Sequence, residues 1–271
     1  KFLRRSEGSS LPVIWLFYFP LGFVVFLKFK SLVYYFIEKN DTNILLAILI
    51  LGSLSVLGPL VGAISTKSIR RIFAFLFLSF MSLSIFCFAL LQAGLLGKER
   101  LEWILFLNIV NLALSIIPVW MVFLRFDDSM DSLNGFMVAN PYMAVNISIA
   151  LLSLAGMAGT PGFLIRYYFF GQYYRYFKQG NLGGTGIAKM AIFVLLAISF
   201  LFILANILRL IISICKKGSS EKQKLGFPKF YYAYITFFII LLLGTGILGL
   251  LEVLGIRILD GFSITGFNFM L

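Results

Sequence analysis

The residues with the clearest potential for chemistry interrupt a long apolar segment, residues 141–178, which has nearly twice the roughly 20 residues that a membrane-spanning helix needs. Glycine and proline release backbone groups that hydrocarbon cannot satisfy, so such an interruption requires protein or a water-filled cavity around it. Broken helices of this kind build the ion sites of many transporters. We therefore predict a discontinuous helix with its break near 156–162, formed by Gly156, Gly159, Pro161 and Gly162.

One arginine follows this break. Arg166 stands about ten residues from the nearest plausible helix end, at Arg175 and Lys178, which is about 15 Å of depth at the helical rise. This distance is long for a side chain that snorkels to the interface, and holding a cation inside the membrane costs free energy. We therefore expect Arg166 to have a buried functional or structural role and take it as a candidate for a proton pathway.

Arg70 and Arg71 are further proton-pathway candidates at the start of another apolar segment. Two interpretations stay open for them: interfacial anchors that snorkel to lipid headgroups, or relay cations that face the bundle interior. Because arginine effectively never deprotonates, each candidate would hold a water chain or set the local field rather than hand on a proton.

Composition limits the class of protein. The 271 residues are 61% hydrophobic and 13% charged, which indicates an integral membrane protein. Histidine is absent and the only cysteines are Cys87 and Cys215, so the usual ligands of haem, iron–sulfur clusters or zinc are missing. The net charge of +12 fits basic inner loops and anionic lipid rather than nucleic acid. No glycine-rich phosphate loop follows a strand-like run, and any redox cofactor must sit on another subunit.

The elements that must position these residues are membrane helices. Connections between the apolar segments are short, so we expect one transmembrane domain over 1–271, an all-α polytopic helix bundle. Lysine and arginine counts place the N-terminus and loop 215–229 on the inner side, matrix or cytoplasm. The expected spans are 11–37, 44–65, 70–95, 103–125, 141–178 (broken), 187–214 and 230–256.

The other ionisable residues in these segments are expected to have structural rather than chemical roles. Snorkelling is the expectation for the cations near segment ends, which are Lys28, Lys30, Lys189 and Arg209. Glu252 lies close to Arg257, which favours a local pair or a partner contact. The glycines at 244, 246 and 249 are typical of close helix packing.

Two stretches together resemble NADH dehydrogenase subunit 2, the antiporter-like membrane subunit of respiratory complex I. Leu152-Ser-Leu-Ala-Gly156 followed by Gly162-Phe-Leu-Ile-Arg166 is similar to the broken-helix motif of that family, and Asn140-Pro141 precedes it as in the family. Thr66–Phe75 is similar to a second family motif, in the same order and at the same spacing. The segment with Asn108 and Asn111 sits where the family has its intervening helices.

The resemblance implies a fold and a role. The family has two inverted repeats of five helices, each with a broken helix, around a buried row of charges. Arg166 falls at the lysine of the broken helix and Arg70 at the lysine of the second motif, with Arg71 beside it. This implies proton translocation coupled to electron transfer from NADH to ubiquinone. NAD, FMN, iron–sulfur clusters and quinone are expected on other subunits. The implied location is the mitochondrial inner membrane, with a bacterial inner membrane as the alternative.

Departures from the family pattern define the alternatives. Both matched lysines are arginines, the family's Pro-Pro is replaced by Ala158-Gly159, and no glutamate matches the family's partner of the first-repeat lysine. We therefore expect the C-terminal part of the subunit, with a separate chain supplying the N-terminal helices or with those helices lost. Other membrane-arm subunits and lipids are the expected partners. The alternatives are a structural membrane subunit with a degenerate proton path, or a secondary cation/proton antiporter subunit, which would need coupling acids that these segments do not offer.

Overall fold

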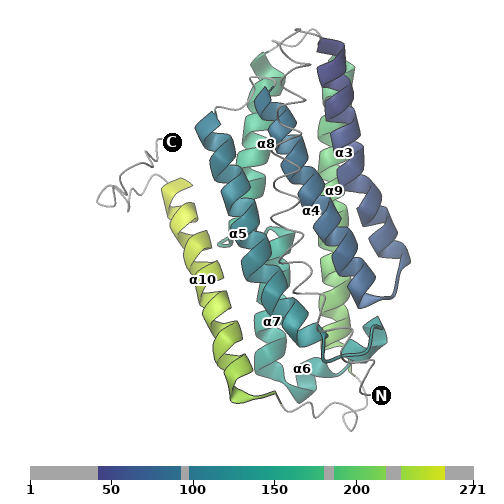
Figure 1. Cartoon of the computed structure of the whole chain (residues 1–271), viewed down its shortest axis with the longest axis vertical. Helices are drawn as coiled ribbons and strands as arrows, with labels where there is room; N and C mark the ends of the chain where they lie inside the picture. The colour runs from purple at the N-terminus through teal and green to yellow at the C-terminus, as the bar shows by residue number, and fades with distance from the viewer. Residues whose placement is uncertain (1–41, 93–97, 180–185, 218–226, 254–271) are drawn as a thin grey trace.

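The computed structural model describes residues 42–92, 98–179, 186–217 and 227–253, and every regular element in these ranges is helical (Figure 1). The chain is an all-α membrane helix bundle, as its sequence predicts. Its elements are α3 (Thr42–Ser65), α4 (Ile69–Gln92), α5 (Lys98–Phe123), the 3-10 turn η1 (Met130–Leu133), α6 (Phe136–Ala139), α7 (Pro141–Ala155), α8 (Pro161–Gln179), α9 (Gly186–Cys215) and α10 (Lys229–Val253).

The helices coincide with the predicted spans wherever the structure describes them; the first span, 11–37, lies outside the described residues. By length and composition, two described helices could cross a membrane, Met190–Cys215 and Lys229–Leu251. Shorter apolar stretches lie at Leu49–Ser65, Val110–Phe123 and Pro141–Ala155. The assignment of 1–271 to one transmembrane domain stays a prediction.

The helices run up and down the bundle, as short connections require. α3 packs against α4 and α9, while α5 lies between α4 on one side and α7, α8 and α10 on the other. α7 and α8 follow each other along the bundle, with the break between them at mid-height (Figure 1). Large side chains fill the interior, and equally apolar ones cover the outside, such as Leu51, Leu201 and Ile240. Helices that are apolar on every face are typical of proteins surrounded by lipid hydrocarbon.

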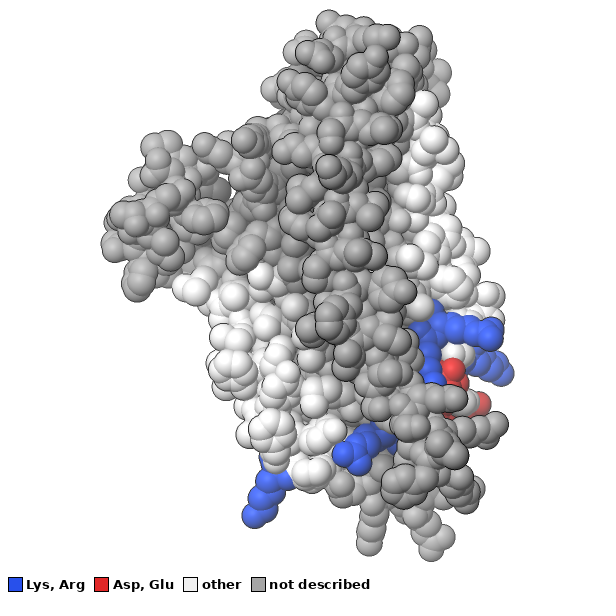
Figure 2. Space-filling model, in the orientation of Figure 1, with Lys and Arg blue, Asp and Glu red and all other residues white. Residues whose placement is uncertain are grey.

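Most of the charged side chains that the structure describes lie at one end of the bundle, which we call the basic end. It is formed where α3 and α9 finish, where α4 and α10 begin, and by the 124–135 connection after α5. Backbone hydrogen bonds tie these segments together, from Met130 N–H to Lys67 O and from Gly135 N–H to Lys216 O. On the face seen in Figure 2, the lysines and arginines lie in its lower half. By their place at these element ends and in the 124–135 connection, its described charged residues are Lys67, Arg70, Arg71, Arg125, Lys216, Lys217 and Lys229, together with Asp127, Asp128 and Asp131.

Candidate functional site at the helix break

The break begins where α7 ends in a left-handed glycine. Gly156 has a φ of 82°, a conformation that a side chain disfavours. Its N–H donates to Ser153 O at 2.9 Å, and Met157 N–H donates to Leu152 O at 3.0 Å. This pair of bonds is the Schellman arrangement, which satisfies the last carbonyls of a helix. The glycine predicted at the break is therefore a helix terminator.

The chain then turns and starts α8 within five residues. Thr160 donates through N–H and through Oγ1 to Met157 O, at 3.2 and 2.6 Å. Pro161 is the first helical residue, a position where the missing N–H costs nothing and the fixed φ favours a helix. A Cβ at Gly162 would overlap Ser153 O, so only glycine lets the start of α8 lie against the end of α7. The two half-helices are therefore in direct contact.

Arg166 bends back from α8 onto the end of α7. Its Nη2 donates to Leu154 O at 2.8 Å, one of the carbonyls that the end of α7 leaves without a helical partner. A cation at a helix C-terminus is also favoured by the helix dipole. On its other side, the guanidinium carbon lies 4.8 Å from the centre of the Phe200 ring of α9. A Cβ on Gly156 would occupy the space of the guanidinium, only 2.7 Å from its Cζ.

A row of buried polar side chains from α5 approaches the same break. Asn108, Asn111 and Ser115 are spaced i, i+3 and i+7, which places them on one face of the helix. Ser153 Oγ of α7 donates to Asn111 Oδ1 at 2.6 Å, and Ser115 Oγ to the same oxygen at 3.4 Å. Asn111 Nδ2 is buried without a partner among the described residues and lies 3.2 Å from where a Cβ on Gly162 would be. The polar row thus ends at the first turn of α8.

Helix α10 closes the break from another side. Cβ atoms at Gly246 and Gly249 would overlap the backbone of Gly159 and Thr160 and the side chain of Leu164, respectively. These two glycines therefore allow α10 to contact the turn and the start of α8 directly, as the small-residue cluster predicts, whereas a Cβ on Gly244 would meet nothing within 4 Å. Helices α5, α9 and α10 pack against α7 and α8 and cover the break on their sides, as irregular backbone in a membrane requires, while Met157 and Ala158 of the turn remain exposed.

Arg70 and Arg71 lie elsewhere. They belong to the first turn of α4, at the basic end, where Arg70 N–H donates to Asp128 Oδ1 at 2.8 Å and Ser68 Oγ donates to Asp128 Oδ2 at 2.6 Å. Arg71 is exposed. α7 separates this end from the break, and its 15 residues span about 22 Å. The structure therefore does not bring the three candidate arginines together; it groups Arg166 with the glycines and proline of the break.

Other sequence-based expectations have mixed outcomes. Arg209 does not simply extend to the surface: its Nη1 donates to Ile64 O at 2.7 Å and to Ala63 O at 3.4 Å, at the last turn of α3. The predictions for Lys28, Lys30, Lys189 and Glu252 concern side chains outside those that the structure describes. Within the described ranges, no group of three histidine, cysteine, aspartate or glutamate side chains could hold a metal ion.

Sequence reasoning left out several contributors to the site. Ser153, Ser115 and Phe200 were not singled out, and Asn111 entered only through a family resemblance. The spacing of Asn108, Asn111 and Ser115 in an otherwise apolar helix is a signal that could have found the polar row. Nothing in the sequence around Phe200 distinguishes it from the other phenylalanines.

Comparisons with known proteins bear on the fold alone. No protein-family model matches the sequence, and no curated protein matches it. The fold is similar to that of a chain in the structure of respiratory complex I from Thermus thermophilus with bound aureothin, with a TM-score of 0.57 and 20% sequence identity. The similarity covers 76% of this chain and 44% of that chain, so this chain spans less than half of the matched one.

Proposed function

We propose that the chain is a membrane-embedded subunit of a complex I-type assembly and contributes to proton translocation there. Its fold is similar to part of a chain found in such a complex. The observation that carries the proposal is the position of Arg166: a cation held against an interrupted helix, 2.8 Å from Leu154 O, with three other helices around the break. A cation in such surroundings inside a membrane marks a functional site by default.

The chemistry open to this site is electrostatic. A guanidinium does not release its proton, so Arg166 acts as a fixed charge. Every carboxylate whose side chain the structure describes lies in the 124–135 connection, so none of them pairs with Arg166. The positive charge therefore acts on whatever titratable group or water chain comes close to the break. Asn111 and Ser115 of the polar row, with Ser153 of α7, give such a chain hydroxyl and amide partners beside it.

The remaining parts of the reaction are proposed for other subunits. NADH oxidation, electron transfer through flavin and iron–sulfur clusters, and quinone reduction would take place there, since this sequence lacks the usual ligands for those groups. Other membrane-arm subunits of such an assembly are the proposed partners. The basic end would face the matrix or the cytoplasm, following the positive-inside rule, in a mitochondrial or bacterial inner membrane.

The test uses the assembled complex in sealed vesicles. Arg166→Ala should lower the number of protons moved per NADH oxidised. Arg166→Lys keeps a cation at the break and should lower this number less. Arg209→Ala is the matched control, because that arginine also donates to backbone carbonyls but lies away from the break. Unchanged proton transfer in the Arg166→Ala complex, with normal assembly, would remove the proton-translocating role.

A structural subunit with a degenerate proton path is the second candidate, and one observation favours it. The Arg166 guanidinium is already occupied by Leu154 O and the Phe200 ring, as expected of a clamp that fixes α8 onto α7. In that case Arg166→Ala would lower the yield of assembled complex and leave proton transfer per NADH unchanged. A continuous hydrated chain between Arg70 and Arg166 in a high-resolution structure of the complex would count against this candidate.

A further inference from the structure

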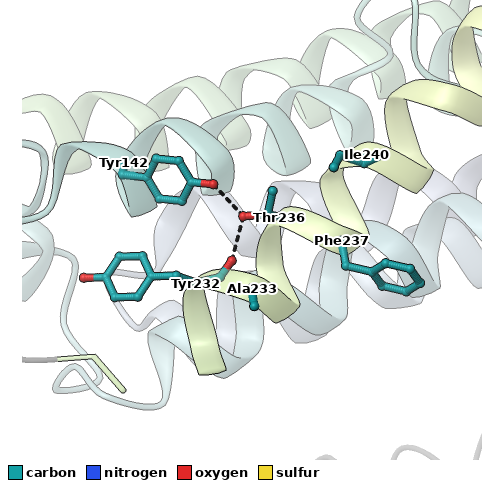
Figure 3. A pocket seen from close by; sticks show the side chains of 6 residues that line it. All are labelled: Tyr142, Tyr232, Ala233, Thr236, Phe237 and Ile240. Carbon is teal, nitrogen blue, oxygen red and sulfur yellow. Dashed lines mark hydrogen bonds between the residues drawn. The ribbon is translucent and has the colours of Figure 1, made fainter. Parts of the chain in front are cut away.

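An open groove lies between the beginning of α7 and the first turns of α10 (Figure 3). Its volume is about 590 Å³, within the range of sites that hold small ligands. It is lined by Tyr142 of α7 and by Tyr232, Ala233, Thr236, Phe237 and Ile240 of α10. Phe237 and Ile240 are 57% and 64% exposed, so the groove opens to the outside of the bundle.

The groove combines an apolar wall with a few polar groups. The hydroxyls of Tyr142 and Thr236 lie 2.5 Å apart and join the two helices (Figure 3). Thr236 Oγ1 also donates to Tyr232 O at 2.6 Å, and Tyr232 Oη donates to Asn140 Oδ1 at 3.5 Å. An elongated apolar ligand with polar atoms at one end matches this distribution.

A lysine continues the groove toward the basic end. Lys229 is exposed and precedes Ala233, Phe237 and Ile240 by four, eight and eleven residues, so it lies on the same face of α10. From Lys229 to Ile240 the helix rises about 16 Å. Arg125 packs on the ring of Tyr231, 5.1 Å from its centre, at a different angle around α10, so of these two described cations Lys229 is the one in line with the groove.

We propose that this groove binds an anionic phospholipid, with its phosphate on Lys229 and an acyl chain along Ala233, Phe237 and Ile240. Charge complementarity decides the occupant: the groove ends at the basic end of the bundle, and the described carboxylates lie in the 124–135 connection, where Asp128 caps α4. Basic pockets between membrane helices on the inner side bind anionic headgroups in this way. The inference is independent of the proton-translocating role.

A tryptophan reporter in the groove tests the proposal. The full chain carrying Phe237→Trp is reconstituted in phosphatidylcholine vesicles, and quenching of the added fluorescence is compared between brominated phosphatidylglycerol and brominated phosphatidylcholine. The expected result is a preference of about fivefold for phosphatidylglycerol, the size expected of one lysine near an anionic surface. Lys229→Gln in the same background should abolish the preference, whereas Arg125→Gln should leave it.

A second reporter separates a groove from general lipid contact. Ile247→Trp lies on α10 beyond the groove, at a side chain that is 49% exposed, and should show no preference between the two lipids. Equal quenching at both reporters would overturn the proposal, as would a preference that survives Lys229→Gln. Absence of quenching by either lipid at Phe237→Trp would show that a protein covers the groove, which also overturns it.

Discussion

The helix break and the basic end both present arginines to a helix terminus, but they use them differently. At the break, Arg166 donates to Leu154 O at the C-terminus of α7, where the helix dipole favours a cation. At the basic end, Arg70 and Arg71 lie in the first turn of α4, where the dipole disfavours them and the carboxylate of Asp128 accepts the free N–H instead. The role of an arginine in this bundle therefore depends on which helix terminus it contacts and on how far the surrounding helices cover it.

The largest expected effect comes from a pair of glycines with the same backbone angle. Gly156 and Gly159 both have a φ of 82°, but only a Cβ on Gly156 would meet the Arg166 guanidinium. Gly159→Ala should cost about 1 kcal/mol for the left-handed conformation. Gly156→Ala should cost roughly 3 kcal/mol, because it also separates Arg166 from Leu154 O. Steric trapping in bicelles measures both unfolding free energies, and equal losses would show that the guanidinium does not depend on Gly156.

Cation–π coupling should differ between the two regions. The Arg166 guanidinium lies 4.8 Å from the Phe200 ring inside the bundle, and that of Arg125 lies 5.1 Å from the Tyr231 ring at the basic end. Double-mutant cycles with Arg→Gln and aromatic→Leu changes should give about 2 kcal/mol for the first pair and about 0.5 kcal/mol for the second. Equal coupling energies would mean that the break is as hydrated as the bundle end.

Removing the carboxylate that caps α4 should have a moderate effect. Asp128→Ala takes away the acceptor of Arg70 N–H and Ser68 Oγ and should cost about 1 kcal/mol of unfolding free energy. Asp131→Ala removes the same charge from the same connection without touching α4. If the unfolding free energy falls by the same amount in both variants, net charge at the basic end rather than capping explains the result.

The smallest effect is expected for Arg71→Ala. This side chain is exposed in the first turn of α4, so the unfolding free energy should change by less than about 0.5 kcal/mol. Proton transfer per NADH in the assembled complex should also stay the same. A clear loss of proton transfer would instead support the relay role that the sequence leaves open for this residue.

The fold was largely predictable because membrane helices are encoded locally. Apolar length marks the helices, and the glycines with Pro161 mark the break within a few residues of its position between Ala155 and Pro161. The site was less predictable. Leu154 O and Phe200, the two groups that hold Arg166, come from residues that look like any other apolar side chain in the sequence.

The sequence by itself determined that this is a helical membrane protein, where its long helix is interrupted and which cation follows the interruption, because hydrophobic length and helix-breaking residues act on neighbouring backbone. Only the tertiary structure decided that Arg166 closes back onto α7, that Asn111 and Ser153 meet beside it, and that Arg70 stays at the far end of α7. Those contacts depend on which helices pack together and at what depth, and the spacing of residues along one chain does not contain that information.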